Sequence, residues 1–274
     1  MIHKILLFGS TGMLGSYIYT YFSSISKLSI IKIDYRITNE NLAKLEDILI
    51  ANKIDKHTCV INCIGLIPQR KSNDALETDY YLVNSIFPQL LSNICNRHNA
   101  KMIQPTTDCV FSGQREDGFY TEDDVPDEHG HYGMSKSLGE PANCTVIRTS
   151  IIGRERFNKR SFLEWVLSNT NKEISGWSNH YWNGITCLEY CNIILRIINE
   201  NLFWNGVRHI CSPTQVSKYE LACMIKDIFA LDMKINETTS GQTVNKTLHT
   251  KFERMFAIKE LYEQLNELKH FQLI

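Results

Sequence analysis

Tyr132 and Lys136 are the two residues whose types and spacing most directly suggest a proton-transfer step. They form the pattern Tyr-Gly-Met-Ser-Lys. On a helix, positions i and i+4 share one face, so the phenol and the ammonium would lie side by side. A phenol with an ordinary pKa of about 10 is a poor acid at neutral pH, and a neighbouring ammonium lowers that pKa. The pair can then pass a proton to a substrate oxygen, although the same pattern also occurs by chance on protein surfaces.

A glycine-rich turn near the N-terminus predicts dinucleotide binding. Gly9, Gly12 and Gly15 follow an expected strand over residues 4–8 and open an expected helix over residues 13–23. The first glycine permits a tight turn, the second lets a pyrophosphate approach the backbone, and the third lets the helix pack close to the sheet. The N–H groups at the helix start cradle phosphate, which adds the intervening positions to the predicted cofactor site: Ser10, Thr11, Met13 and Leu14. No Gly-Lys-Ser/Thr follows, which excludes a P-loop.

Asp34, Tyr35 and Arg36 follow the expected second strand, residues 29–33, and should adjoin the cofactor ribose. An acid at position 34 suits the ribose hydroxyls of NAD, whereas Arg36 suits the 2′-phosphate of NADP. Arg36 is nearly as well explained as an ordinary surface arginine. The choice between NAD(H) and NADP(H) therefore stays open, with a slight preference for NADPH.

The elements that must position these residues alternate between short apolar runs and longer amphipathic stretches. We predict strands at 4–8, 29–33, 58–63, 101–105 and 144–149, and helices at 13–23, at 79–97 and just before Pro141. This alternation predicts an α/β fold with a Rossmann-type, doubly wound parallel sheet. After Gly153 strands become rarer, and helices are predicted at 161–168, 187–199, 217–229 and 258–268. We expect an NAD(P)-binding domain over 1–152 and a smaller, mostly helical substrate-binding lobe over 153–274, part of which packs back on the first.

Composition narrows the class of partner. The formal net charge is -1, so there is no basic excess of the kind that binds nucleic acid. No apolar run reaches the roughly 18 residues of a membrane span, so we expect no membrane partner. The nine cysteines include no Cys-x-x-Cys pair, and the first apolar run is short for a secretory signal. We expect reduced thiols, no metal site and a cytoplasmic location.

The order and spacing of these motifs resemble the extended short-chain dehydrogenase/reductase family. The glycines are spaced GxxGxxG, and Tyr132 follows Gly15 by 117 residues. The resemblance implies that Tyr132 protonates a carbonyl oxygen as hydride reaches its carbon, and that Lys136 also holds the nicotinamide ribose. It further implies that Thr107 hydrogen-bonds the substrate carbonyl. The segment Cys63-Ile64-Gly65 would line the adenine and ribose of the cofactor.

Within that family, four segments resemble the dTDP-4-dehydrorhamnose reductases: 107–113, 120–126, 132–140 and 146–153. The resemblance implies NAD(P)H-dependent reduction of the C4 keto group of a dTDP- or UDP-linked 4-keto-6-deoxyhexose, with or without an N-acetyl group. Dimers are common in this class, so a homodimer is the assembly it favours. Substrate contacts are expected from Thr107, Cys109, Phe111, Arg154, His180 and Trp182, with Gln69, Arg70 and Trp177 as weaker candidates. Phe111, Trp177 and Trp182 are equally well explained as core residues, and a ligand contact is the less favoured interpretation of Gln69, Arg70 and Arg154.

Cys109 departs from these relatives, which usually carry an aromatic residue at its position. It resembles the cysteine of GDP-fucose synthases, which implies a bifunctional 3-(or 3,5-)epimerase/4-reductase with Cys109 as base and His180 or Lys172 as its partner. A small residue lining the pocket is the simpler interpretation. A 4,6-dehydratase is less favoured because the family's Asp-Glu after the catalytic Thr is Asp108-Cys109 here. A non-catalytic NADP-binding regulatory subunit is the remaining alternative, and the intact Thr107, Tyr132 and Lys136 argue against it.

Overall fold

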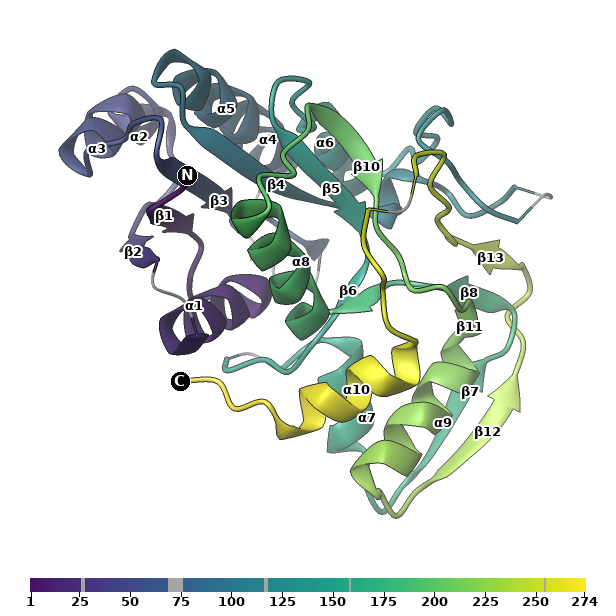
Figure 1. The fold of residues 1–274 in the computed structure, drawn as a ribbon. Helices are drawn as coiled ribbons and strands as arrows, with labels where there is room; N and C mark the ends of the chain where they lie inside the picture. Colours follow the sequence, from purple (N-terminus) through teal and green to yellow (C-terminus); the bar gives the residue numbers. More distant parts are fainter. Residues whose placement is uncertain (26–27, 69–75, 116–117, 158, 254) are drawn as a thin grey trace.

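The computed structural model describes residues 1–25, 28–68, 76–115, 118–157, 159–253 and 255–274, and its centre is a parallel β-sheet. Six strands lie in the order β10-β5-β4-β3-β1-β2, and every neighbouring pair is parallel (Figure 1). These strands are β1 (Lys4–Phe8), β2 (Ser29–Ile33), β3 (Thr58–Asn62), β4 (Lys101–Thr107), β5 (Thr145–Thr149) and β10 (Gly206–His209). The α/β, Rossmann-type prediction is confirmed.

Each central strand sends alternate side chains to opposite faces of the sheet, and each face has its own core. Ile5 and Leu7 of β1 join the core that includes α1 (Met13–Ile25) and α8 (Cys187–Asn199). Leu6 and Phe8 join the core that includes α3 (Leu45–Ala51) and α5 (Phe87–Arg97). Because both of its faces are covered, β1 is apolar at every position except Lys4, as expected for a central strand of a parallel sheet.

The helix predicted over residues 79–97 is interrupted at its middle. It consists of α4 (Glu77–Tyr81), a π-helical turn (Leu82–Ile86) and α5. Pro88, at the start of α5, has no N–H, so it cannot donate to the carbonyl of Asn84 four residues earlier. The backbone instead closes a wider turn in which Phe87 N–H bonds the carbonyl of Leu82. This widening places Asn84 at the site described below.

The later half of the chain contains more strand than the sequence pattern predicted, and one of its strands, β10, lies in the main sheet. The others form small sheets: β7 (Glu173–Trp177) with β12 (Lys234–Thr238), β6 (Ile151–Ile152) with β9 (Ile185–Thr186), and β8 (His180–Trp182) with β11 (Val216–Ser217) and β13 (Val244–Asn245). They are short, and β7 alternates buried with exposed residues, a weak signal in sequence. The division at residue 152 remains a prediction.

The remaining helices are α2 (Asn39–Leu42), α6 (His131–Leu138), α7 (Phe162–Ser168), α9 (Lys218–Phe229) and α10 (Leu261–His270), with a 3-10 turn at Asp108–Val110. Helix α10 packs on both α8 and α9, and α9 and α10 lie below the sheet in the view of Figure 1. Among the described helices, none combines the length and apolar character that a membrane span requires.

Candidate functional site

The glycine turn between β1 and α1 is shaped by close contacts at two of its three glycines. Gly9 has a φ of 72°, and a Cβ there would lie 2.7 Å from the carbonyl carbon of Cys63. A Cβ on Gly15 would lie 2.1 Å from the carbonyl oxygen of Gly9. Contacts within the protein therefore explain both glycines: Gly9 is required by the tight turn, and Gly15 by the close packing of the helix on the sheet.

Gly12 is different, because the chain itself leaves room for a side chain there. The nearest atom to a Cβ on Gly12 is the Gly9 carbonyl oxygen, at an ordinary 3.4 Å. Its N–H bonds that same oxygen at 3.0 Å, which closes the turn containing Ser10 and Thr11. Helix α1 begins at Met13 and Leu14 with no acidic residue in its first turn. An open approach to the backbone at an unopposed helix N-terminus fits the pyrophosphate of a dinucleotide.

Asp34, Tyr35 and Arg36 directly follow β2, as predicted. Their side chains point in different directions, two toward solvent and one toward the core. Asp34 and Arg36 are exposed. The Tyr35 ring stacks on Phe87 at 5.6 Å and meets the edge of Phe8, and its buried hydroxyl has no hydrogen-bond partner among the described residues. Both an acid and a guanidinium therefore remain free to reach a ribose, and the geometry does not separate NAD from NADP.

Lys136 lies against the loop that follows β3. A Cβ on Gly65 would come within 2.6 Å of Lys136 Nζ, so the ammonium occupies the space beside this glycine. Burial lowers the pKa of Lys136 to about 8, opposed by the nearby Cys63 thiol and Glu140 carboxylate. Burial likewise raises the pKa of the Cys63 thiol, which keeps it protonated. The structure thus places Gly65 and Cys63 near Lys136, while the expected contact of Cys63, Ile64 and Gly65 with the adenine and ribose remains a prediction.

Tyr132 and Thr107 meet at the end of β4. Burial raises the pKa of Tyr132, with a smaller contribution from Cys109, while a side-chain hydrogen bond with Thr107 acts in the opposite direction. The Thr107 hydroxyl also accepts from the N–H of Cys109 at 3.1 Å and donates to Asp108 Oδ1 at 3.1 Å. At neutral pH the phenol is therefore neutral and holds a proton beside a threonine hydroxyl.

Two contacts fix helix α6, which carries Tyr132 and Lys136. A Cβ on Gly133 would lie 2.4 Å from the backbone oxygen of Cys109, so α6 packs directly on the segment that carries Thr107. Asn84 forms the second contact: it exchanges two hydrogen bonds of 2.9 Å with the backbone of Leu66 and donates to Ser135 Oγ at 3.1 Å. Sequence reasoning missed Asn84, and the only local signal was the proline four residues later.

Cys109 lies at this site with its thiol protonated. Burial, followed by the charge of Asp108, raises the pKa of the Cys109 thiol to about 12. With that pKa, almost none of the thiolate, the form that accepts a proton, is present at neutral pH. The geometry therefore gives no support to Cys109 as the base of an epimerase.

Lys218, at the start of α9, is a second residue that sequence reasoning missed. Its ammonium lies over the rings of Phe162, at 5.1 Å, and Trp182, at 5.2 Å. Burial lowers the pKa of Lys218, while the nearby Asp108 carboxylate and, to a lesser degree, the Cys109 side chain act against that shift. Among the described residues no carboxylate pairs with it. Lys246, whose charge also acts on Lys218, lies 3.6 Å from Glu128.

His180 is half-buried near Lys218. Burial and then the Lys218 charge lower the pKa of His180, its Nε2 lies 2.7 Å from Ser240 Oγ, and its ring contacts Trp177 at 4.4 Å. Lys172 is exposed and precedes β7, whereas His180 follows it, so the strand separates the two. Arg154 is paired with Glu164 at 2.8 Å. Gln69 and Arg70 lie outside the described residues.

Two of the predicted substrate contacts are instead core residues. Phe111 has no exposed surface and stacks on Tyr120 at 4.1 Å, beneath the Arg148 guanidinium. This corrects the expectation that Phe111 packs on a sugar face. Trp182 is 4% exposed and belongs to the main core, so its ring reaches the site only through Lys218. An aromatic residue beside a motif does not reveal which way its ring turns.

A buried polar network begins at the end of α6. Glu140 pairs with Arg148 through two hydrogen bonds of 2.6 and 3.0 Å, and Arg148 Nη1 lies 3.0 Å from His209 Nε2. His209 Nδ1 in turn lies 2.7 Å from the carbonyl oxygen of His249. Burial and Arg148 lower the pKa of His209 to about 4, so its imidazole is neutral and donates from Nδ1 to that carbonyl. This network connects the end of α6 to β5 and β10.

Comparisons with known proteins agree with this geometry. The family model described as RmlD substrate binding domain matches residues 3–259. The spore coat polysaccharide biosynthesis protein SpsK of Bacillus subtilis is 28% identical over 176 residues, which is 61% of this chain and 60% of SpsK. A dTDP-4-dehydrorhamnose reductase of Mycobacterium tuberculosis H37Rv is 34% identical over 112 residues, 36% of each chain. The chain thus aligns with less than two thirds of the length of these relatives.

Solved structures resemble the whole chain. A Bacillus anthracis dTDP-4-dehydrorhamnose reductase in complex with NADP has a TM-score of 0.79 and 17% identity, covering 97% of this chain and 98% of that one. A Clostridium acetobutylicum dTDP-4-dehydrorhamnose reductase has a TM-score of 0.76 and 20% identity at the same coverage. At these identities the likeness establishes the fold. The match of the family model over nearly the entire sequence establishes more: the chain belongs to the RmlD substrate binding domain family.

Proposed function

We propose that this protein uses NADPH or NADH to reduce the C4 keto group of a nucleotide-linked 4-keto-6-deoxyhexose. The observation that carries the proposal is the hydrogen bond between buried Tyr132 and Thr107, with Lys136 about one turn further along the same helix, α6. Lys136 Nζ occupies the space beside Gly65, and a buried, neutral Tyr132 shares a hydrogen bond with Thr107. A proton donor, a hydroxyl and an ammonium in one site suit reduction of a carbonyl group.

The chain's own groups would act as follows. The Gly9–Leu14 turn and the α1 N-terminus would hold the pyrophosphate, and Lys136 with the Cys63–Gly65 loop would hold the ribose next to the nicotinamide. Bound NAD(P)H supplies the hydride. Thr107 would orient the substrate carbonyl, and Tyr132 would give its phenolic proton to the oxygen. Lys136, with a pKa of about 8, is mostly charged at neutral pH and stabilises the phenolate that this leaves.

Two lysines support a phosphate-linked substrate. The Lys218 ammonium faces the Asp108–Cys109 segment without a carboxylate partner among the described residues, and Lys246 lies close enough for its charge to act on Lys218. Removing an ammonium from water without a partner is costly, so an anionic ligand beside Lys218 would relieve that cost. We infer that these lysines receive the diphosphate of a sugar nucleotide.

Oxidation of NADPH and NADH, followed at the nicotinamide absorbance, tests the proposal. The substrates are dTDP- and UDP-4-keto-6-deoxyglucose and the 2-acetamido analogue of the UDP sugar. We expect turnover with one of them, and a loss of roughly a hundredfold to ten-thousandfold in Tyr132→Phe. Tyr81→Phe, on neighbouring α4, is the matched control. Cofactor binding without oxidation by any of these sugars would favour the regulatory alternative instead.

A further inference from the structure

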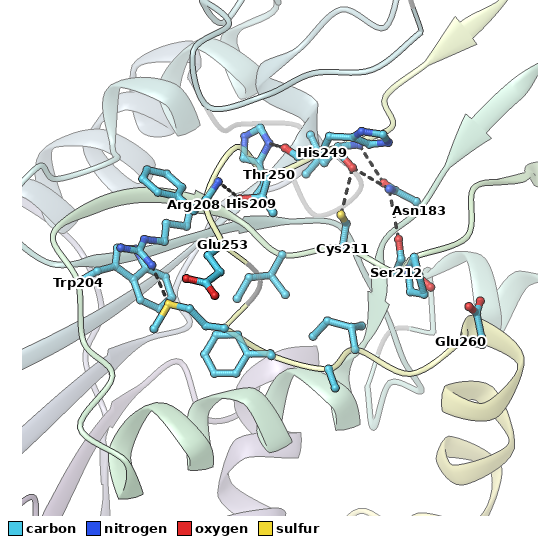
Figure 2. Close-up of a pocket in the computed structure, with 18 residues that line it drawn as sticks. Asn183, Trp204, Arg208, His209, Cys211, Ser212, His249, Thr250, Glu253 and Glu260 are labelled. Carbon is cyan, nitrogen blue, oxygen red and sulfur yellow. Dashed lines mark hydrogen bonds between the residues drawn. The ribbon is translucent and has the colours of Figure 1, made fainter.

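A cavity lies beside β10, away from the catalytic residues. Its volume is about 580 Å³, within the range of small-molecule sites. Its walls come from the end of β10, from the segment after it, and from the chain between β13 and α10 (Figure 2). None of the catalytic or cofactor residues described above lines it. The catalytic site therefore leaves this cavity without an assigned role.

Arg208 forms one wall, and its hydrogen-bonding capacity is nearly unused. The guanidinium lies between two aromatic rings, 5.1 Å from Trp204 and 4.5 Å from Phe252. Within the described part of the chain, its Nη1 donates to the Met255 sulfur at 2.7 Å, which is a weak acceptor. A guanidinium carries five N–H donors, so a ligand oxygen in the cavity would find donors already oriented by the flanking rings.

Carboxylates supply the complementary acceptors. Figure 2 shows Glu253 at the same end of the cavity as Trp204 and Arg208, and Glu260 at the other end near Ser212. Neither an ion pair nor a hydrogen bond of the Glu253 carboxylate is present in the described structure. The Ser212 hydroxyl is buried beside the cavity and also lacks a partner there. Glu260 already accepts from the Thr214 hydroxyl through Oε2, so at that end Glu260 Oε1 and the Ser212 hydroxyl are the groups left for a ligand.

The space between these groups is apolar. Phe252, Phe256, Ile258 and Leu248 line it, together with Trp204. Flat aromatic and apolar walls favour a flat ligand, because ring systems gain from stacking as well as from burial. An edge that carries an N–H donor next to a carbonyl acceptor would match Glu253 and Arg208 together. Hydroxyl groups at the far end would match Glu260, as ribose hydroxyls match acidic residues elsewhere.

We propose that this cavity binds a nucleoside, with the base between the aromatic walls, its hydrogen-bonding edge on Arg208 and Glu253, and its ribose toward Glu260. The net charge of these three side chains is negative. The binding energy therefore comes from the base and the sugar, and no phosphate is required. This distinguishes the site from the lysine-lined substrate site.

The test is equilibrium titration of the purified chain with guanosine, thymidine and uridine, each alone, monitored by calorimetry. We expect one of them to bind at one site per chain. Arg208→Gln and Glu253→Gln should each weaken that binding roughly tenfold or more, because each removes a charged hydrogen bond to the base. Phe252→Ala, which removes one stacking wall, should weaken it as well, and circular dichroism confirms that each variant is folded.

Lys218→Met is the matched control, since it alters the proposed substrate site and should leave nucleoside affinity unchanged. The proposal is overturned if no nucleoside binds at concentrations of about 1 mM, or if Arg208→Gln and Glu253→Gln leave the affinity unchanged. Because the titration needs neither cofactor nor turnover, its failure is separate from a failure of the reductase proposal.

Discussion

Replacing Lys136 with Met should stabilise the fold while it abolishes activity. The ammonium lies against Gly65 without a carboxylate partner in the described structure, and its pKa falls from 10.5 to about 8 on burial. At about 1.4 kcal/mol per tenfold change, that shift corresponds to a cost of about 3 kcal/mol for keeping the charge in the folded protein. Methionine fills a similar volume without the charge, so we expect a gain of about 1–3 kcal/mol at neutral pH.

The stability gained by Lys136→Met should depend on pH. Below pH 8 the lysine is charged in both the folded and the unfolded chain, so the penalty is fully present and the variant gains most. Between 8 and the unfolded value of 10.5 the folded lysine becomes neutral and the gain disappears. Urea denaturation of both proteins at about pH 7 and about pH 10 measures this difference, and the matched control is the exposed Lys56→Met. A Lys136→Met variant that is less stable at both pH values, or equally stabilised at both, would refute the reasoning.

Four further outcomes follow from the same structure. Gly12→Ala should weaken NADP⁺ binding with little change in the unfolding midpoint, whereas Gly15→Ala should lower that midpoint because its Cβ meets the Gly9 oxygen at 2.1 Å; titration and denaturation of both variants check this. Glu140→Ala should cost about 3–5 kcal/mol in denaturation, since it leaves the Arg148 charge buried and unpaired. Folding stability should fall as pH drops from 6.5 toward 4, because His209 resists protonation only when folded, and His209→Gln should flatten that slope. Solvent deuterium should not enter the sugar carbon beside the keto group, because the Cys109 thiol stays protonated; uptake that Cys109→Ala removes would restore the epimerase alternative.

The parts of the site that could be predicted from sequence are those whose residues are close in the chain. The glycine turn follows a strand and opens a helix within a dozen residues, and Tyr132 and Lys136 share one helical face. Local spacing therefore carries the geometry, and the structure brings both motifs to the ends of the parallel strands.

The remaining parts depend on contacts between distant segments. Asn84 joins Leu66 to Ser135, and Lys218 approaches Asp108 from a helix more than a hundred residues later. Hydrophobic periodicity predicts local helices and strands, and it does not predict contacts between distant segments. Phe111 is the opposite case. Its place close to Thr107 in the sequence suggested a ligand contact, but its ring is buried in the core.

The most direct test of the account is the fate of the hydride. NADPH carrying deuterium at C4 of the nicotinamide, in each of its two stereochemical forms, is incubated with the protein and the keto sugar that supports turnover. The account predicts that one form places deuterium on C4 of the product sugar, read by mass spectrometry and NMR, and that Tyr132→Phe suppresses this transfer. A sugar recovered without deuterium from either form, in a sample whose cofactor is bound, would contradict the assignment of this site to carbonyl reduction.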